Sequence, residues 1–346
     1  MAISESTSSA GMSVMTERQS CVVIGSNSFS GACFVDHLLQ QGYDVFGSSR
    51  SAEPHDAFLP YKWPSRPGKF SFHQCDLNDD LGGLMALVRQ HKTPYVINFA
   101  AQSMVAESWQ NPGDWFMTNA VSTVKLHDEL RKCEFLKRYV HVSTPEVYGS
   151  CSGFVDEGVP FNPSTPYAVS RAAGDMSLKT FHAAYDFPVV TTRAANVYGP
   201  GQQLYRIISR TILYILLGKR LQLHGGGVSR RSFIHMDDVS DATLKIMLHG
   251  KNGDTYHIST DEVVSIRQLV EMICRKLDVR FEDHAEIVGD RLGKDAAYQL
   301  DSTKLRTELN WKDNVTLDQG LDQCIEWVQH NFDALKAQPF DYIHKR

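Results

Sequence analysis

Apolar positions alternate along the first two thirds of the chain between short continuous runs and longer stretches with helical spacing. The runs predict strands buried on both faces, and the stretches between them predict crossover helices. Strands are expected at residues 21–24, 43–47, 70–75, 95–100, 139–143 and 189–194, and helices at 32–41, 81–92, 115–133 and 167–185. This strict alternation with short connections predicts an α/β protein built on a doubly wound parallel sheet.

The rhythm changes after residue 198, where shorter elements follow one another. Helices are expected at residues 206–217, 266–276 and 317–332, with a short strand at 221–223 and a Gly-rich turn at 225–227. These elements predict a smaller C-terminal lobe. The expected divisions are a disordered Ser-rich tail at 1–19, a sheet domain at 20–197 plus about 233–260, and the lobe at 198–232 and 261–346.

Composition narrows the class of protein. The 346 residues carry 35 basic and 40 acidic side chains, and the net charge of −5 argues against a protein that coats nucleic acid or an acidic membrane. No export signal is recognisable near the first residue, and no apolar run approaches the length of a membrane span. Seven scattered cysteines indicate reduced thiols, and the histidines lack metal-ligand spacing. We therefore expect a cytoplasmic protein without metal, nucleic acid or membrane as partner.

A turn rich in Gly and Ser lies between the first strand and the first helix. In this position free backbone N–H groups and the positive end of a helix dipole meet a pyrophosphate. The turn therefore predicts a dinucleotide site in a Rossmann-type domain, although its middle position, usually glycine, is Ser28. The residues expected to bind the cofactor here are Gly25, Asn27, Ser28, Phe29, Ser30 and Gly31.

The end of the second strand bears on the choice of cofactor. A NAD-binding chain usually offers an acid there to the ribose 2′-hydroxyl, whereas this chain has Ser49 and Arg50. A guanidinium beside hydroxyls suits a 2′-phosphate, so NADP is preferred over NAD. Asp76 and Leu77, after the third strand, are positioned to meet the adenine, and Asp76 has a helix cap as its alternative role.

Candidate catalytic residues follow the fifth strand and begin the next long helix. Thr144 and Glu146 come directly after the strand, and Tyr167 and Arg171 are spaced to share one helix face. A cation beside a phenol lowers the pKa of the phenol and makes it usable as a base near neutrality.

Taken together, these stretches resemble the extended short-chain dehydrogenases/reductases, and among them the chain is similar to the nucleotide-sugar 4,6-dehydratases. Arg50 and residues 100–103 are most like the GDP-mannose enzymes, whereas residues 290–298 are more like the dTDP-glucose enzymes. The matching stretches are 25–31, 98–103, 143–149, 167–171, 196–200, 231–239 and 290–295. The resemblance implies a lyase that converts a nucleoside-diphosphate (NDP) hexose to its 4-keto-6-deoxy form with one retained NAD(P).

The resemblance also implies roles for individual residues. Tyr167 would take the O4 proton while hydride leaves C4, Thr144 would hydrogen-bond O4, and Glu146 would remove the C5 proton before water leaves from C6. Further residues near the cofactor would be Phe99, Ala100, Ala101, Asn119, Ser143, Tyr167 and Arg171. Substrate contacts would come from Ser103, Asn196, Arg206, Arg231 and Arg291, of which Arg231 and Arg291 are the expected diphosphate clamps.

Two positions depart from the family pattern. Arg171 stands where the family has lysine, and Pro145 stands where the dTDP-glucose enzymes have an aspartate that protonates the leaving hydroxyl. Glu146 is then expected to serve as base and acid. Two alternatives remain open: a 4-epimerase or decarboxylase of the same superfamily, and a catalytically inactive NADP-binding sensor, suggested by Ser28 and by both departures.

The expected helices at 115–133 and 167–185 are long enough to pair with a second copy of themselves. Relatives commonly dimerise through such a four-helix contact. The expected partners are therefore an NDP-sugar and a second copy of the chain.

Overall fold

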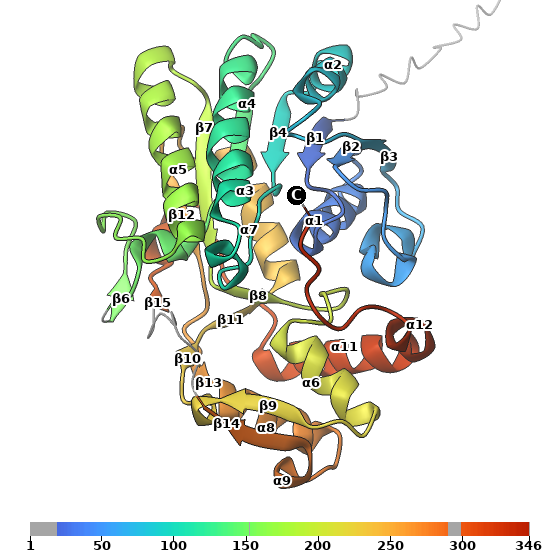
Figure 1. The fold of residues 1–346 in the computed structure, drawn as a ribbon. Coiled ribbons are helices and arrows are strands. Elements are labelled where there is room, and N and C mark those ends of the chain that lie inside the picture. The colour runs from blue at the N-terminus through green and yellow to red at the C-terminus, as the bar shows by residue number, and fades with distance from the viewer. Residues whose placement is uncertain (1–18, 152, 290–298, 346) are drawn as a thin grey trace, which may run out of the picture.

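The computed structural model describes residues 19–151, 153–289 and 299–345. The expected tail, apart from Gln19, and the motif at 290–295 lie outside the described residues. The described chain forms a seven-stranded sheet with helices on both faces, and a smaller lobe adjoins one end of the sheet (Figure 1). The predicted α/β fold with a doubly wound sheet is confirmed.

All seven strands of the main sheet run parallel, in the order β12-β7-β5-β4-β1-β2-β3. Six lie within two residues of their predicted bounds, whereas the four-residue β12 was not predicted. The order reverses between β1 and β4, so a crevice is expected outside the carboxyl ends of these two strands. The strands are β1 Ser20–Ile24, β2 Asp44–Ser49, β3 Lys69–Gln74, β4 Tyr95–Asn98, β5 Arg138–Val142, β7 Val189–Ala194 and β12 Thr255–Ile258.

Each face of the sheet has its own apolar core because strand side chains alternate. Cys21 and Val23 of β1 face the core under α1 (Phe29–Gln40) and α7 (Met236–His249). Val22 and Ile24 face the opposite core. The helices over that second core are α2 Leu81–His91, α4 Thr123–Leu130 and α5 Pro166–Tyr185.

The long helix predicted at 115–133 is interrupted. It begins as α3 (Pro112–Phe116), continues as a π-helical segment, Met117–Ser122, and ends as α4. Thr123 Oγ1 donates to Thr118 O within this segment, 2.8 Å away. Such π-segments are frequent near functional sites, and here the segment carries Asn119, one of the expected cofactor residues.

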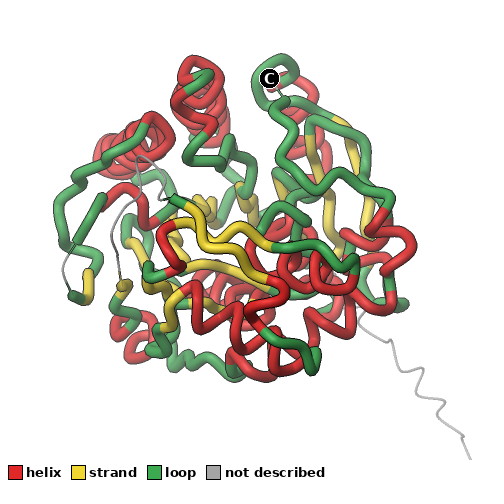
Figure 2. Tube along the Cα trace, turned by 60° about the horizontal axis from the view of Figure 1, so that its bottom comes forward, coloured by secondary structure: helices red, strands yellow, loops and turns green. Residues whose placement is uncertain are grey.

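The smaller lobe is held together by a separate apolar core, to which α6 (Ile207–Leu216), α8 (Ile266–Lys276) and α11 (Leu317–His330) contribute. Figure 2, with this lobe turned toward the viewer, shows its helices grouped around short strands. The remaining helices are α9 Phe281–His284, α10 Thr303–Glu308 and α12 Phe332–Lys336. The remaining strands are β6 Phe154–Val155, β8 Asn196–Tyr198, β9 Leu221–His224, β10 Arg230–Arg231, β11 Phe233–His235, β13 Val264–Ser265, β14 Ala285–Val288 and β15 Gln299–Leu300. Short 3-10 helices are Asp56–Phe58, Pro60–Lys62, Glu107–Trp109, Pro145–Tyr148 and Gly225–Gly227.

None of the helices in the described ranges combines the length and the apolar character that a membrane crossing requires.

Candidate functional site

The turn between β1 and α1 depends on two glycines. Gly25 has φ +83°, and a Cβ there would lie 2.6 Å from the backbone N of Ala100. A Cβ on Gly31 would lie 2.1 Å from Gly25 O. Ser28, by contrast, has an extended φ of −73° and caps α1, because its Oγ accepts from Gly31 N at 3.1 Å. The middle position therefore needs no glycine, and the turn keeps the helix N-terminus at the end of β1.

Two adjoining cavities open at the carboxyl edge of the sheet. The side cavity, of about 350 Å³, lies beside the ends of β1, β2 and β3. The central cavity, of about 580 Å³, lies beside the ends of β5 and β7. Five residues line both of them: Ser28, Phe99, Ala101, Gln203 and Tyr205. The two cavities therefore form one continuous site with the β1–α1 turn at their junction.

The side cavity gathers the residues expected on the adenosine side of a dinucleotide. Asn27 ties the turn to the second strand, since its backbone N donates to Ser49 Oγ at 3.0 Å. The Asp76 carboxylate accepts from Asn78 N at 2.8 Å, so it also stabilises the loop in which it lies. The expected residues that line this cavity are Gly25, Asn27, Ser28, Ser49, Arg50, Asp76, Leu77, Phe99, Ala100 and Ala101.

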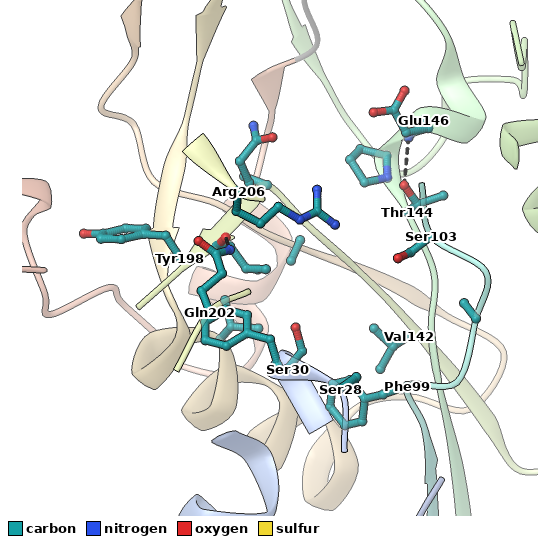
Figure 3. A pocket seen from close by; sticks show the side chains of 18 of the residues that line it. Ser28, Ser30, Phe99, Ser103, Val142, Thr144, Glu146, Tyr198, Gln202 and Arg206 are labelled. Atoms are coloured by element: carbon teal, nitrogen blue, oxygen red, sulfur yellow. Dashed lines mark hydrogen bonds between the residues drawn. The ribbon is translucent and has the colours of Figure 1, made fainter. Parts of the chain in front are cut away.

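The central cavity brings the expected catalytic residues together with expected substrate residues from the other lobe. Thr144 caps the 3-10 helix Pro145–Tyr148, and its Oγ1 accepts from Glu146 N at 3.3 Å. Figure 3 shows the Arg206 guanidinium extending across the cavity toward the side of Thr144. The expected residues that line this cavity are Ser28, Phe29, Ser30, Phe99, Ala101, Ser103, Ser143, Thr144, Glu146, Tyr167, Arg171, Asn196 and Arg206.

Tyr167 stands in the first turn of α5, which Thr165 caps by accepting from Ala168 N at 3.1 Å. Burial raises the pKa of the Tyr167 phenol, while the Arg171 charge and a hydrogen bond with Thr144 lower it. The charge of Glu146 also raises the pKa of Tyr167, and the charge of Arg206 also lowers it. Burial prevails, so the pKa of Tyr167 is raised above its ordinary value rather than lowered as the sequence predicted, and Arg171 only limits the rise.

Arg171 points at the strand end next to the tyrosine. Its guanidinium donates to Val142 O and lies 3.5 Å from His141 Nε2. Behind it, the buried carboxylate of Asp175 accepts from Ser143 Oγ at 2.7 Å and from Arg193 at 2.6 Å. Arg171 is thus held by β5 in a buried polar network.

Three expected site residues of the described ranges, Gly31, Asn119 and Arg231, line neither cavity. Asn119 lines neither cavity; its amide donates to Gln102 O at 2.9 Å and to Ser170 Oγ at 3.0 Å, so it braces the loop after β4 from behind. Arg231 lies on β10, also outside both linings, and its Nη1 donates to Arg230 O. Arg291 lies outside the described residues.

Other lining residues were missed by the sequence reasoning. Gln202, Gln203 and Tyr205 follow the turn after β8, where a polar and aromatic run beside glycine was a usable signal. Tyr342 and Lys345 also line the side cavity. Nothing in their local sequence indicates this position, because they reach it through long-range contacts.

Comparison with known proteins agrees with this geometry. A family model for GDP-mannose 4,6 dehydratase matches residues 22–324. The dTDP-glucose 4,6-dehydratase of Xanthomonas campestris pv. campestris is 33% identical over 281 residues, covering 75% of this chain and 79% of that protein. The crystal structure of the dTDP-glucose 4,6-dehydratase of Streptomyces venezuelae, with NAD and TYD bound, superposes with a TM-score of 0.83 at 30% identity, covering 91% of this chain and 98% of that one.

A structure of UDP-glucose 4-epimerase from Thermotoga maritima, with UDP-glucose, is also similar, with a TM-score of 0.81 at 25% identity, covering 91% of this chain and all of that one (100%). The range matched by the family model spans both the sheet domain and most of the lobe. The chain belongs to the GDP-mannose 4,6 dehydratase family, among the nucleotide-sugar 4,6-dehydratases of the extended short-chain dehydrogenase/reductase class.

Proposed function

We propose that this nucleotide-sugar 4,6-dehydratase binds an NDP-hexose in the central cavity and removes water across C5 and C6, with Tyr167 and Glu146 as its proton-transfer residues. The observation that carries the proposal is that Thr144, Glu146 and Tyr167 line one cavity, which is continuous with a cavity suited to a dinucleotide. A base for a hydroxyl and a base for a carbon acid are both required by this reaction.

The cofactor we propose is NAD or NADP, with NADP favoured. The β1–α1 turn fits a dinucleotide, because the absence of side chains at Gly25 and Gly31 lets the turn pack tightly on itself and on Ala100, which keeps the N-terminus of α1 at the end of β1. Ser49 and Arg50 line the side cavity where a 2′-phosphate would lie, and no acid accompanies them at the end of β2. When bound, the nicotinamide supplies a reversible hydride acceptor, so the overall reaction is redox-neutral.

The first step assigned to the chain is proton removal from O4. Tyr167 accepts this proton, and Thr144 donates a hydrogen bond that orients the same oxygen. Burial outweighs the positive charges of Arg171 and Arg206, so the pKa of Tyr167 lies above its ordinary value, and the two charges limit that rise. Oxidation at C4 then acidifies the proton at C5.

The second step assigned to the chain is elimination. Glu146 removes the C5 proton and passes it to the C6 hydroxyl, which leaves as water, because the neighbouring Pro145 has no proton to give. The bound cofactor would supply the hydride that C6 gains. C5 takes up one proton, and Tyr167 releases the proton it accepted from O4, so that the residue returns to its starting state. The atoms balance as one NDP-hexose giving one 4-keto-6-deoxy product and one water.

For the substrate, we propose that Arg206 meets the negative charge of the diphosphate and that Ser103 and Asn196 bind sugar hydroxyls; all three line the central cavity. Arg231 and Arg291 stay proposed diphosphate ligands; Arg231 lies outside both cavity linings in this structure, and Arg291 lies outside the described residues.

The test is product analysis with GDP-mannose, dTDP-glucose, UDP-glucose and CDP-glucose. We expect one of them to yield a 4-keto-6-deoxy product, with deuterium moved from C4 to C6. An epimerised or decarboxylated product without loss of water would favour the alternative suggested by the similar epimerase structure.

Tyr167→Phe should abolish turnover and leave dinucleotide affinity within about twofold, since it removes only the proton acceptor. Retained turnover would remove Tyr167 from the mechanism.

We also propose that the enzyme is a homodimer. Apolar side chains are exposed on neighbouring elements, Met117 (46%) and Val121 (42%) on the π-segment and Met176 (58%) on α5. A patch of this kind on adjacent helices suits a two-fold contact with a second copy. The expected cytoplasmic location stays part of this proposal, supported by seven free cysteines.

A further inference from the structure

The last described residues cross the side cavity. From α12 the chain, drawn in dark red, climbs away from the smaller lobe to the carboxyl edge of the sheet and ends beside α1 and α3 (Figure 1). Three residues of this segment, Tyr342, Ile343 and Lys345, belong to the wall of the side cavity. We call residues 340–345 the strap.

The strap is fastened on both sides of the cavity. At the lobe, Arg210 of α6 donates to Asp341 Oδ1 at 2.7 Å and also to Phe340 O. At the sheet domain, His344 lies 2.7 Å from Asp114 Oδ2 and stacks on the Trp115 ring with centroids 5.0 Å apart. The strap therefore bridges the two lobes.

Just beyond the His344 anchor, the strap contacts Arg50, a proposed cofactor residue, and Gln102, which also lines the side cavity. Lys345 O accepts from Arg50 Nη1 at 2.9 Å and from Gln102 Nε2 at 2.7 Å. Arg50 follows β2 and Gln102 follows β4, and these two strands flank β1 in the sheet. The Lys345 carbonyl therefore connects the two sides of the cavity. A guanidinium has five N–H donors, so Arg50 can serve the strap and a phosphate together.

Phe340 packs against the apolar core of the smaller lobe, but beyond it the strap buries little apolar surface, since Ile343 is 61% exposed. Its fastening is mainly polar and ring-to-ring, including Tyr342 against Tyr205 with centroids 5.6 Å apart. Segments held in this way open at much lower cost than the core. The strap can therefore open without unfolding either lobe.

We propose that residues 340–345 form the closing wall of the dinucleotide site and retain the bound cofactor between turnovers. The inference rests on the proposed function, because a redox-neutral cycle gives the cofactor back in its starting state and requires no exchange. The dinucleotide enters when residues 342–345 lift, and the His344 and Arg210 anchors then fix the strap over it.

The test measures association and dissociation rates of NADPH and NADH by stopped-flow fluorescence in the full chain. Asp114→Ala removes the partner of His344 without touching either cavity lining, and should raise the dissociation rate about tenfold, the effect of losing one charge-assisted hydrogen bond. Deleting residues 340–346 should raise it further. The matched control is Asp333→Ala, because Asp333 also lies in the first turn of a five-residue helix and pairs with Lys336. This control should leave both rates unchanged.

Two results would overturn the proposed role of the strap. Dissociation from Asp114→Ala at the wild-type rate would show that the segment does not retain the cofactor. Tighter binding after either change would show that the segment competes with the cofactor for the cavity. Both measurements use the cofactor alone, without substrate. If the protein shows no dehydratase turnover, the proposed function is wrong and this test still stands. If the wild-type chain binds neither dinucleotide, the proposed function and the role of the strap are both wrong.

Discussion

At the scale of single residues, the arginine at position 171 differs from the family lysine in what it contacts. Its guanidinium is committed to Val142 O and to the neighbourhood of His141, so it works on Tyr167 mainly through its charge. A lysine carries the same charge on a more compact group with different donors. Substitutions at position 171 therefore test whether a positive charge alone is enough to keep Tyr167 active as the proposed base.

Arg171→Met should move the pH profile of kcat to higher pH. Loss of the positive charge raises the pKa of Tyr167, and since a base works in its deprotonated form, the rising limb moves upward with it. Where the limb moves by one pH unit, kcat at a fixed pH on it falls about tenfold. Arg171→Lys is the matched control and should keep the limb near its wild-type position. An unchanged profile in the methionine variant would contradict the role.

Other residues mark where sequence reasoning reaches its limit. Thr144, Glu146 and Tyr167 could be placed on one edge because they follow a strand end or begin a helix, and topology brings such positions together. Asn119 could not be separated from the lining residues, because only the structure shows that its amide is used by Gln102 and Ser170. Arg231 likewise could not be separated from the lining residues by sequence, because only the structure shows that it lies outside both linings.

At the scale of elements, α5, β5 and β7 are joined by one buried carboxylate. Asp175 of α5 binds Ser143 after β5 and Arg193 of β7. Burial raises the pKa of Asp175, but Arg193 and His141 outweigh it and hold that pKa well below its usual range. The pair therefore stabilises the fold above the ordinary carboxyl pKa, and this contribution is lost as the pH falls toward the depressed value.

Asp175→Asn should lower the free energy of unfolding by about 3–5 kcal/mol at neutral pH, because it leaves the Arg193 charge buried without a counter-charge. Urea denaturation measures the change, and the difference from wild type should shrink at acid pH. Asp128→Asn, in an exposed ion pair on α4, is the control and should leave the midpoint unchanged. Equal stability of the Asp175 variant and wild type would contradict the proposed junction.

Element boundaries could be predicted wherever periodicity and flanking turns agree. The bounds of α8 and of β7 match their expectations residue for residue. The π-segment could not be predicted, since it preserves the amphipathic pattern of a longer helix while its hydrogen bonds shift. The strap could not be predicted either: Lys345 meets Arg50 across 295 positions, and no local pattern encodes such a contact.

At the scale of the whole molecule, the exposed apolar patch on the π-segment and α5 predicts the oligomeric state. Met176→Glu should convert a dimer to a monomer, because two like charges would meet across the two-fold contact. Light scattering after size exclusion measures the mass. Ile287→Glu is the control, since Ile287 is similarly exposed, 61% against 58%, but lies on β14 in the smaller lobe. A monomeric wild type would contradict the dimer.

Tyr205 and Gln203 form part of the wall of both cavities. A molecule bound in one cavity therefore contacts the same two side chains as a molecule bound in the other. Binding free energies are reciprocal, so any gain in sugar-nucleotide affinity caused by the dinucleotide is returned as an equal gain for the dinucleotide. The shared wall thus offers a direct route for coupling between the two bound molecules, and any such coupling would be measured as equal changes in their two binding free energies.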